Sequence, residues 1–395
     1  MFNLKTLRVI VSMNPSYGGP CQGIRNSVPA LRRLGIETEV LSVDPVDSEF
    51  LGMDDFPIYT VGPSRTGYSY TANLDVWLKE NFHNYEAIIV HGLWQYSTYG
   101  TFKVWNKMKA LNKVVPALYL MPHGMLDPYF QKAKERRFKA IRNLIFWQLF
   151  EKHVVNGVSG LLFTCEQELL LAKRTFTDYH PKEQFNVGYG IQTPPKESPE
   201  HNEAFQNVCP KVSNRRYWLF LSRIHPKKGV DLLIQAYKAL KSHGADLPDL
   251  VIAGPGLDTS YGEMLIKLAD RDAQIVFPGM LQGAAKWGAF YGCEAFVLPS
   301  HQENFGIAVV EALACSKPVL ISKQVNIWRE IEEDGAGIVA QDTLTGTITL
   351  LNAWISKGVA ERVEMEKRAL STYQQKFNTE TFANKLSDIL LKSTS

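Results

Sequence analysis

The stretch AFVLPSHQENFGIAVVEALACSKPVLI, residues 295–321, contains a complete strand–loop–helix–strand unit. The apolar run at 295–298 has the pattern of a buried strand in a parallel sheet, and apolar residues with helical spacing follow Phe305–Gly306. A second apolar run, 318–321, starts the next strand. The polar corner at 301–304 therefore follows the carboxyl end of a strand, where open α/β sheets bind their ligands.

Two carboxylates frame this unit, Glu303 in the corner and Glu311 in the helix, with seven residues between them. The backbone N–H groups from Asn304 to Ile307 are suited to bind an anion, and Gly306 lets a phosphate approach the backbone closely. A carboxylate repels phosphate but accepts two hydrogen bonds from a vicinal diol. The unit therefore predicts a nucleotide sugar as ligand. Two solvated surface acids are the alternative when the glutamates are considered alone.

A second strand-to-helix junction carries two cations. The predicted strand 217–221 leads into SRIHPKKG, in which Arg223 and Lys228 stand five positions apart across a proline-containing turn. Two cations directed at one crevice suit a diphosphate, and they can stabilise the charge on a departing nucleoside diphosphate. Surface-loop cations without a ligand are the alternative. Further along, Gly279, Met280 and Leu281 follow a predicted strand and offer backbone groups and an apolar surface to a planar base.

The first half of the chain opens with a predicted βαβ unit whose loop contains Gly18 and Gly19. This loop does not match G-x-G-x-x-G, which weighs against a dinucleotide dehydrogenase. The two glycines can admit a diphosphate or an acceptor hydroxyl, and a purely structural turn is equally compatible. Farther on, His123 follows the predicted strand 117–120 and precedes Gly124. An imidazole there can hydrogen-bond a sugar hydroxyl, although a lone histidine is more often structural.

Residues 132–153 are predicted to form one long helix. Its first half is basic and contains Lys132, Lys134, Arg136, Arg137, Lys139 and Arg142. Large apolar residues fill its second half, namely Ile141, Ile145, Trp147, Leu149 and Phe150, and a further one, Phe138, stands among the cations. The pattern favours a solvated start and a core-packed end. The alternative is an interfacial surface for anionic lipid, which would suit a lipid-linked acceptor.

Composition is typical of an ordinary globular protein. The chain has 395 residues, 45% hydrophobic and 21% charged, which is enough for two domains. A net charge of +3 gives no argument for nucleic acid. Five scattered cysteines form neither a disulfide framework nor a zinc site. We expect a cytoplasmic protein, with contact at the inner face of the cell membrane at most peripheral, because no signal peptide or membrane-spanning stretch is evident.

Taken together, S-R-x4-K-G at 222–229, E-N-F-G at 303–306 and Glu311 resemble the retaining glycosyltransferases often called group 1, or family 4, which have the GT-B fold. The resemblance covers nearly the whole chain and is most specific from Trp218 to Glu311. It implies an α/β protein with two Rossmann-like domains that face each other across a central cleft. Two departures stand out: the family's frequent E-G-F-G is E-N-F-G here, and its usual Gly-Gly-x-x-Glu corner is replaced by VNIWRE at 325–330.

The sequence also predicts a domain plan, because the proline-rich stretch 194–214 lacks periodicity and is typical of a linker between two domains, and the resemblance assigns a role to each domain. Residues 1–193 would be the acceptor-binding domain and 215–377 the nucleotide-sugar-binding domain, joined by a proline-rich linker at 194–214. Residues 378–395 would form a helix that packs back on the first domain.

The site roles are implied in the same way. Arg223 and Lys228 would bind the diphosphate together with the backbone of Phe305, Gly306 and Ile307. Glu311 would bind the ribose, Glu303 would bind the donor sugar, and the base would lie against Gly279, Met280 and Leu281. From the first domain, the residues that approach the ligand would be His123, Gly18 and Gly19. Glu303, His123, Arg223 and Lys228 would be the catalytic set, and Asn304 would belong to the donor site.

The implied reaction moves a hexose from a UDP- or GDP-sugar to a hydroxyl of a cell-surface glycan or glycolipid precursor, by front-face displacement. No metal or other cofactor is expected, and Asp270–Arg271–Asp272, a D-x-D string, favours a solvated helix end. The alternatives are a nucleotide-sugar epimerase or hydrolase of the same fold, a transferase acting on a small soluble acceptor, and a non-enzymatic sugar-binding protein.

Overall fold

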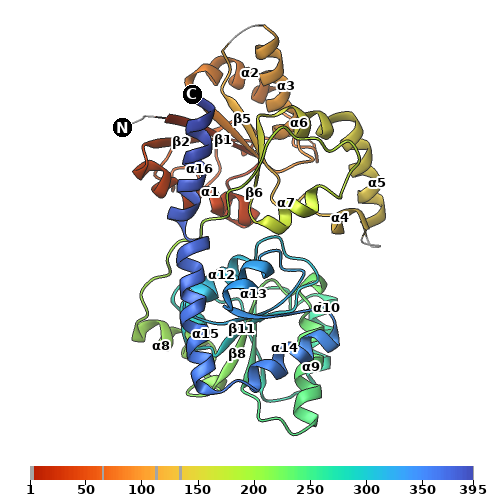
Figure 1. The fold of residues 1–395 in the computed structure, drawn as a ribbon, viewed down its shortest axis with the longest axis vertical. Coiled ribbons are helices and arrows are strands. Elements are labelled where there is room, and N and C mark those ends of the chain that lie inside the picture. The colour runs from red at the N-terminus through yellow and green to blue at the C-terminus, as the bar shows by residue number, and fades with distance from the viewer. Residues whose placement is uncertain (1–3, 65, 112–113, 133–135, 395) are drawn as a thin grey trace. The chain divides into compact units, whose positions relative to one another are not determined.

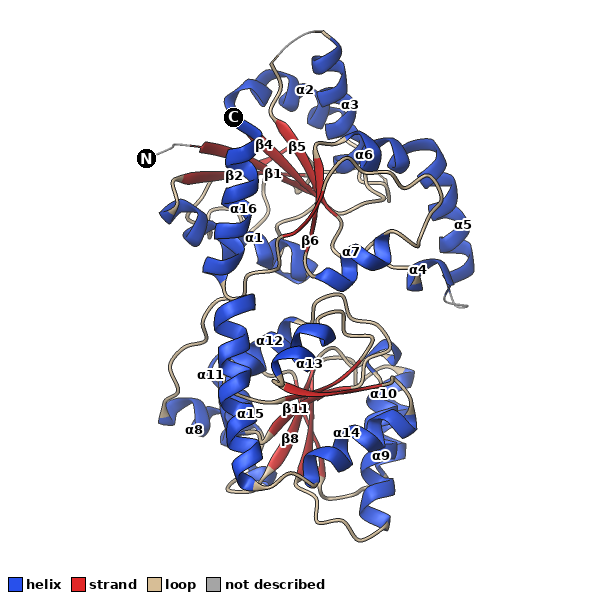
Figure 2. Ribbon diagram, viewed as in Figure 1, coloured by secondary structure: helices blue, strands red, loops and turns tan. Residues whose placement is uncertain are grey.

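The computed structural model describes residues 4–64, 66–111, 114–132 and 136–394 (Figure 1). The chain forms two compact units, one made of Met1–Gly190 with Thr379–Ser395 and the other of Ile191–Asn378. Each unit contains a parallel β-sheet with helices on both faces (Figure 2). This confirms the predicted pair of Rossmann-like α/β domains, because parallel strands joined by crossover helices bury both faces of their sheet.

The first unit has a seven-stranded sheet in the order β3-β2-β1-β4-β5-β6-β7. Its strands are β1 (Leu4–Ile10), β2 (Ile36–Ser42), β3 (Ile58–Thr60), β4 (Ala87–His91), β5 (Ala117–Met121), β6 (Gly160–Phe163) and β7 (Gln184–Asn186). The chain extends from β1 to β2 and β3 on one side and then returns to add β4 to β7 on the other. The β1–β4 boundary is therefore the topological switch point, where such sheets bind ligands.

Helices from both ends of the chain cover this sheet. They are α1 (Gly19–Arg33), α2 (Ala72–Asn81), α3 (Tyr96–Ala110), α4 (Tyr129–Lys132), α5 (Arg137–Phe146), α6 (Lys152–Gly157), α7 (Glu166–Ala172) and α16 (Thr379–Thr394). The C-terminal helix α16 packs against α1, and its Phe382, Leu386 and Leu390 are buried (Figure 1). The core of the first unit is therefore completed only by the last residues of the chain.

Residues 132–153 do not form the single helix with a core-packed end that the sequence favours. After α4 ends, α5 begins at Arg137 and continues through a π-helical turn, Trp147–Glu151, into α6. Trp147 is fully buried and stacks on Phe176, with ring centroids 4.4 Å apart. The side chains of Phe138, Ile141, Ile145 and Leu149 are instead exposed by 90, 58, 52 and 59%. The prediction was wrong because periodicity reveals an apolar face but not whether another element covers it.

The second unit has a six-stranded parallel sheet in the order β10-β9-β8-β11-β12-β13. Its strands are β8 (Tyr217–Leu221), β9 (Asp249–Ala253), β10 (Ile275–Gly279), β11 (Ala295–Leu298), β12 (Val319–Ser322) and β13 (Gly337–Ala340). The predicted strands at 217–221 and 295–298 are β8 and β11, and they are neighbours in the sheet. They flank the switch point of this unit, since β9 and β10 extend to one side of β8 and β12 and β13 to the other.

The helices of the second unit are α8 (Pro199–Val208), α9 (Val230–Ser242), α10 (Ser260–Ala269), α11 (Gly283–Gly292), α12 (Ile307–Ala314), α13 (Trp328–Asp334), α14 (Leu344–Ile355) and α15 (Val359–Thr372). Helix α9 packs against α10 and α14, whereas α15 packs against α12 and α13 on the other side of the sheet (Figure 2). Among the described residues of either unit, every helix is too short or too polar to cross a lipid bilayer.

The stretch 194–214, predicted as an aperiodic linker, contains α8 and packs within the second unit. Pro199 opens the helix, and the His201 ring accepts a hydrogen bond from the Ser198 N–H at 3.2 Å. Helix α8 lies so close to α11 that a Cβ on Gly288 would be 2.0 Å from the His201 carbonyl oxygen. The prolines disguised this helix, although a proline in the first turn is itself a helix-start signal.

The two loops at the switch point of the second unit are joined through backbone groups. The Lys227 carbonyl accepts hydrogen bonds from Ser300 Oγ at 2.8 Å and from the His301 N–H at 2.7 Å. Gly229 adopts φ +66°, and a Cβ there would lie 2.2 Å from the Pro299 carbonyl oxygen. Only glycine fits this position, because both the backbone conformation and the close approach of Pro299 exclude a side chain.

Replacing Gly229 with alanine is expected to lower the free energy of unfolding of the second unit by at least about 3 kcal/mol. Gly244→Ala is the matched control: its φ is +82° but nothing lies within 4 Å of the added Cβ. The control should lose only the conformational part, about 1 kcal/mol. Urea unfolding measures both. Equal losses would show that the contact with Pro299 does not restrict this junction.

Removing the Phe205 side chain tests whether residues 194–214 are structural. Phe205 is 2% exposed, so Phe205→Ala should destabilise the second unit by about 3 kcal/mol. Val208→Ala, on the same helix but 46% exposed, should change stability by less than about 0.5 kcal/mol. If urea unfolding gave the same small change for both variants, α8 would behave as a linker after all.

Candidate functional site

Lys228 and Glu303 are in direct contact at the switch point of the second unit. The Lys228 Nζ donates to Glu303 Oε2, and the two side chains are only 13% and 22% exposed. Lys228 ends the short 3-10 turn Pro226–Lys228 after β8, and Glu303 follows β11. The joined loops described above therefore bring together a cation and a carboxylate that are 75 positions apart in the sequence.

The backbone of Glu303 is held by the segment that follows β12. The Glu303 N–H donates to the Gln324 carbonyl at 2.9 Å, and the Asn326 N–H donates to the Glu303 carbonyl at 3.0 Å. This segment includes the VNIWRE corner, where the sequence departs from the pattern of the family that it resembles. Asn326 Nδ2 also lies 3.5 Å from Asn304 Oδ1. The departure thus lies directly against the predicted donor-site loop and contributes to its position.

Glu311 is paired with a lysine that the sequence reasoning missed. Lys286 Nζ lies 2.6 Å from Glu311 Oε1, and the same ammonium group lies 4.4 Å from the centre of the Trp287 ring. Burial raises the pKa of Glu311, and the charge and hydrogen bond of Lys286 act in the opposite direction. Lys286 belongs to α11 and stands in no recognisable motif, so only the ion pair that joins α11 to α12 in the folded chain identifies it.

The remaining predicted donor residues differ in exposure. Phe305 is buried edge-to-face against Phe377, with ring centroids 5.6 Å apart, and therefore supports the loop rather than facing solvent. Gly306 has φ +79° and is the N-cap of α12, so the N–H groups of Ile307 and its neighbours begin the helix there. Arg223 is exposed and has no hydrogen-bond or ion-pair partner within the described ranges.

The predicted base-binding segment follows β10. Gly279 has φ +81°, with no atom within 4 Å of where a Cβ would stand, and its carbonyl accepts a hydrogen bond from the Gly254 N–H at 2.8 Å. Leu281 is buried, whereas Met280 is 59% exposed. An open glycine beside an exposed thioether leaves room for a flat apolar ligand against this segment.

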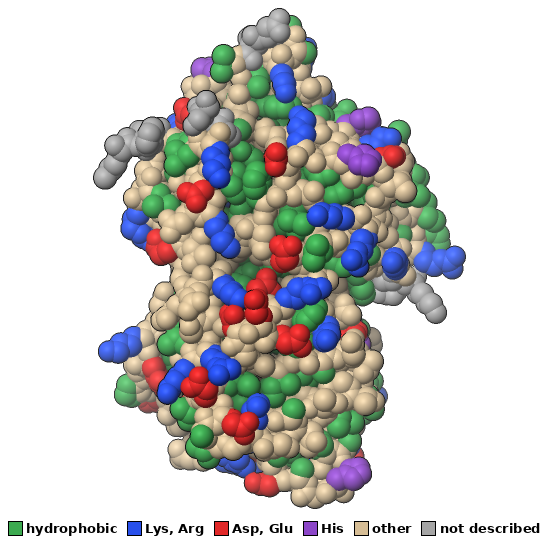
Figure 3. All heavy atoms as spheres, viewed as in Figure 1, with side chains coloured by type: hydrophobic (Ala, Val, Ile, Leu, Met, Phe, Trp, Pro, Cys, Tyr) green, Lys and Arg blue, Asp and Glu red, His purple; other side chains and the backbone are tan. Residues whose placement is uncertain are grey.

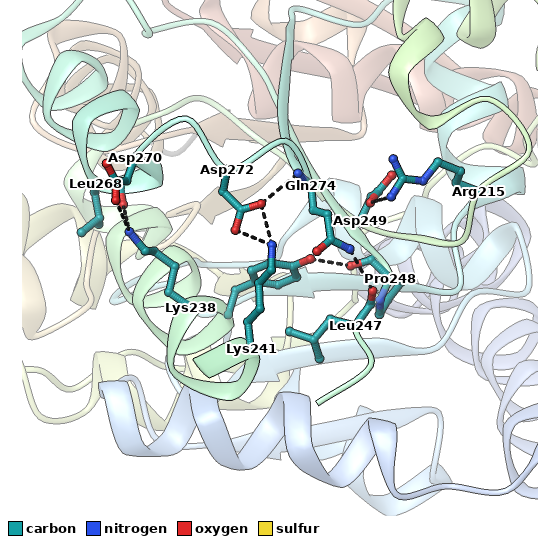
Figure 4. Close-up of polar contacts among 11 residues, drawn as sticks. Arg215, Lys238, Lys241, Leu247, Pro248, Asp249, Leu268, Asp270, Asp272 and Gln274 are labelled. Carbon is teal, nitrogen blue, oxygen red and sulfur yellow. Dashed lines mark hydrogen bonds and ion pairs between the residues drawn. The ribbon is translucent and has the colours of Figure 1, made fainter. Parts of the chain in front are cut away.

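The D-x-D string is tied to the neighbouring helix by lysines. Figure 4 shows Lys241 Nζ between the two carboxylate oxygens of Asp272, at 2.8 and 2.7 Å, and Lys238 beside Asp270 at 3.6 Å. The pKa of Asp272 is lowered: burial acts to raise it, and the hydrogen bonds from Lys241 and the Gln274 N–H, together with the charges of Lys241 and Lys238, outweigh that effect. Both acids thus serve the packing of α9 against the end of α10, and Asp272 is held in a specific ion pair rather than solvated.

The first unit contains its own predicted residues at the carboxyl edge of its sheet. His123 has φ +53°, and its Nε2 lies 2.8 Å from Nδ1 of His91 at the end of β4. The next residue, Gly124, donates its N–H to the buried Glu168 at 2.5 Å. Gly18 has φ +90° with open space where a Cβ would stand, and Gly19 begins α1. The two glycines therefore leave the backbone before α1 accessible, and His123 is fixed from two sides.

Comparison with known proteins agrees with these features. Residues 202–390 match the family model of glycosyl transferases group 1. An uncharacterized glycosyltransferase from Methanocaldococcus jannaschii is 34% identical over 121 residues, which cover 30% of this chain and 30% of that protein. The O-antigen chain mannosyltransferase B of Escherichia coli is 28% identical over 125 residues, 31% of this chain and 30% of that protein. The matched segments thus span about a third of these relatives.

Among solved structures, that of Anabaena HepE in complex with UDP-glucose has a TM-score of 0.70 at 16% identity and covers 98% of this chain and 100% of that chain. At this identity the likeness shows the fold alone. Together with the two parallel-sheet units, it confirms the fold predicted from the sequence. The chain therefore has the GT-B fold and carries, in residues 202–390, a domain of the group 1 glycosyltransferase type.

Proposed function

We propose that this protein is a retaining glycosyltransferase of family 4, which transfers a hexose from a nucleoside-diphosphate sugar to a hydroxyl of a cell-surface glycan or glycolipid precursor. The observation that carries the proposal is the contact of Lys228 with Glu303 at the switch point of the second unit. A diphosphate needs a cation and sugar hydroxyls need an acceptor oxygen, and this pair offers both side by side. When the donor binds, its phosphate replaces Glu303 as the partner of Lys228, and a sugar hydroxyl replaces Lys228 as the partner of Glu303.

The other residues of the second unit fit the remaining parts of the donor. Arg223 is exposed on the same loop as Lys228 and can extend a planar fork to the diphosphate. Backbone N–H groups at the start of α12 add an anion seat beside Gly306. Glu311 accepts the ribose hydroxyls, and Met280 contacts the base. The complex of HepE with UDP-glucose supports a UDP-sugar as donor, and a GDP-sugar is the other candidate.

The proposed chemistry follows from where charge develops. The bond between the anomeric carbon and the phosphate oxygen breaks, and the acceptor oxygen bonds to the same face of that carbon. The leaving phosphate takes the proton of the acceptor hydroxyl, so no separate base is needed. Lys228 and Arg223 stabilise the negative charge on the leaving group, and Glu303 lies beside the positive sugar ring. These cations perform the task of a metal ion, and we propose that the reaction is metal-independent.

An exposed apolar face on α5 and on the π-helical turn that continues it supports an acceptor at a lipid surface. Phe138, Ile141, Ile145 and Leu149 recur at helical spacing and are all more than half exposed. Exposed cations lie on the same helix at Arg137, Lys139 and Arg142, whereas Lys134 lies outside the described residues. Figure 3 shows hydrophobic and basic side chains together along the edge where α5 runs. An amphipathic helix of this kind binds the interface of an anionic membrane. We therefore propose that the protein works at the inner face of the cell membrane.

The donor site is tested by variants in a sugar-transfer assay. Lys228→Ala and Glu303→Ala should each reduce transfer about 100- to 1000-fold, because each removes a group that stabilises developing charge. Lys267→Ala and Glu263→Ala, exposed on α10, make the same changes in charge and should leave the rate unchanged. A thermal-shift panel of UDP-, GDP- and ADP-sugars identifies the donor, because a ligand that binds only the folded state raises its stability.

Two results would contradict this assignment. Wild-type rates in either site variant would show that the contact is not part of the active site. Consumption of the nucleotide sugar without any acceptor would instead favour an epimerase or hydrolase of the same fold. Transfer to a small soluble sugar in preference to a lipid-linked one would remove the membrane acceptor from the proposal.

The membrane face is tested by vesicle binding. Replacing Phe138 and Ile141 with serine should reduce binding to vesicles rich in phosphatidylglycerol at least about tenfold, since two large apolar side chains no longer enter the interface. Val359→Ser with Val363→Ser is the matched control, because these residues are also exposed but lie on α15, where the exposed Lys367 and Arg368 alternate with the exposed acids Glu361 and Glu364. Equal binding of both double variants, measured by co-sedimentation, would leave α5 without a lipid-binding role.

A further inference from the structure

A chain of three side chains crosses the switch point of the first unit. Nη1 of Arg8, on β1, lies 3.4 Å from Nε2 of His91, on β4. Nδ1 of the same His91 lies 2.8 Å from Nε2 of His123. The planes of the two imidazole rings make an angle of 20°, and their centroids are 5.1 Å apart, a separation that suits a hydrogen bond from one ring edge to the other. Arg8 and His91 are 1% and 3% exposed, whereas His123 is partly exposed.

The hydrogen-bonding roles along this chain follow from Arg8. A guanidinium group only donates, so Nε2 of His91 must accept and Nδ1 of His91 must carry the proton. His91 then donates to Nε2 of His123, which leaves the proton of His123 on Nδ1. Both rings are neutral: burial and the charge of Arg8 lower the pKa of His123 to about 3, and burial lowers that of His91 well below its usual value.

We propose that Arg8 and His91 are positioning residues that hold His123 as a neutral imidazole with its proton on Nδ1. This inference rests on the proposed transferase function, since the family resemblance implies that His123 binds a sugar hydroxyl of a substrate. Nδ1 of His123 has no hydrogen-bond partner within the described ranges, so its N–H is available to a sugar hydroxyl. His123 then acts as a fixed hydrogen-bond donor. It cannot act as a general base, because its only basic nitrogen already accepts the proton of His91.

The surroundings of the buried Arg8 favour a positioning role over an ion pair or an anion site. No carboxylate contacts Arg8 in the described part of the chain, and its Nε and Nη2 lack partners, which argues against an ion pair. The cavity that Arg8, His91 and His123 share is about 10 Å³, the size of one water, which is too small for an anion. A buried unpaired cation is costly, and the bond to His91 is the one specific interaction that the described structure gives it.

The rest of the His123 loop is already fixed without this chain. The buried Glu168 accepts hydrogen bonds from the Gly124 N–H at 2.5 Å and from the Thr164 N–H at 2.8 Å. Glu168 thereby ties the loop after β5 to the loop after β6. Loss of Arg8 or His91 should therefore change the proton position on His123 more than the position of its backbone, which makes the two effects separable by experiment.

The proton position can be measured directly by nitrogen NMR of the full-length protein labelled at histidine. Two-bond couplings show which ring nitrogen is protonated, and His123→Asn assigns the signals. In the native protein we expect a proton on Nδ1 of His123. His91→Phe removes the donor and should move the proton to Nε2, whereas His91→Asn, whose amide N–H replaces that of Nδ1, should keep it on Nδ1. A native His123 protonated on Nε2 would overturn the proposal.

Arg8→Met provides a second arm, with the exposed Arg174→Met as control. Loss of the buried charge should raise the pH at which His123 titrates and let both histidines exchange tautomers, and the control should do neither. An unchanged titration in Arg8→Met would overturn the role of Arg8. The circular dichroism spectrum shows whether each variant is folded. If Arg8→Met fails to fold, comparison of His91→Phe with His91→Asn still tests whether His91 sets the proton position on His123.

Activity gives a readout that separates this inference from the proposed function. His91→Phe should lower kcat roughly tenfold with little change in the KM for the nucleotide sugar, the loss expected for one hydrogen bond, and His91→Asn should restore most of it. Equal kcat for the native protein and His91→Phe would overturn the role in catalysis. A protein with the predicted tautomer but no transfer from any nucleotide sugar would refute the proposed function and leave the positioning of His123 intact.

Discussion

The Lys227 carbonyl, which accepts hydrogen bonds from Ser300 and His301, joins the two loops on which the second unit depends. Without this join, the loop after β8 and the loop after β11 would be two independent surface segments. With it, and with Gly229 allowing the backbone of Pro299 to approach, Lys228 meets the carboxylate of Glu303. The polar groups of the site are thus placed by backbone hydrogen bonds and by one glycine rather than by the charged side chains themselves.

Both predicted acids of the second unit are held by lysines. Glu303 contacts Lys228 and Glu311 contacts Lys286, each pair largely shielded from water. Burial raises the pKa of Glu311, because it disfavours the charged form, and the charge and hydrogen bond of Lys286 oppose that rise. A lysine beside each acid also holds the carboxylate in a fixed place. The pairs therefore matter less for stability, where a buried ion pair contributes little, than for the placement of the two carboxylates that the proposed donor site uses.

The two units use the same topological device for different chemistry. In each, the strands that flank the switch point carry the interacting side chains: β8 and β11 lead to Lys228 and Glu303, while β1 and β4 carry Arg8 and His91. The first pair has opposite charges and is partly exposed, which suits exchange with a charged ligand. The second is a buried cation on a neutral imidazole, which suits a fixed orientation. Under the proposed function, the second unit binds a charged ligand and the first directs the single N–H group of His123.

The sequence alone determined the alternation of strands and helices, the E-x7-E spacing and the S-R-x4-K-G junction, because these depend on neighbours within about ten residues. It did not reveal Lys286 or the Arg8–His91 bond, since each depends on packing between segments far apart in the chain. It missed the helix at 199–208 for a local reason, because the prolines of this stretch resemble those of a linker. It also misjudged α5: a period of apolar residues marks one face of a helix, but only the tertiary structure decides what, if anything, covers that face. The reason is physical. Local spacing sets which side chains share a surface, whereas strand order and close backbone approach set which surfaces meet.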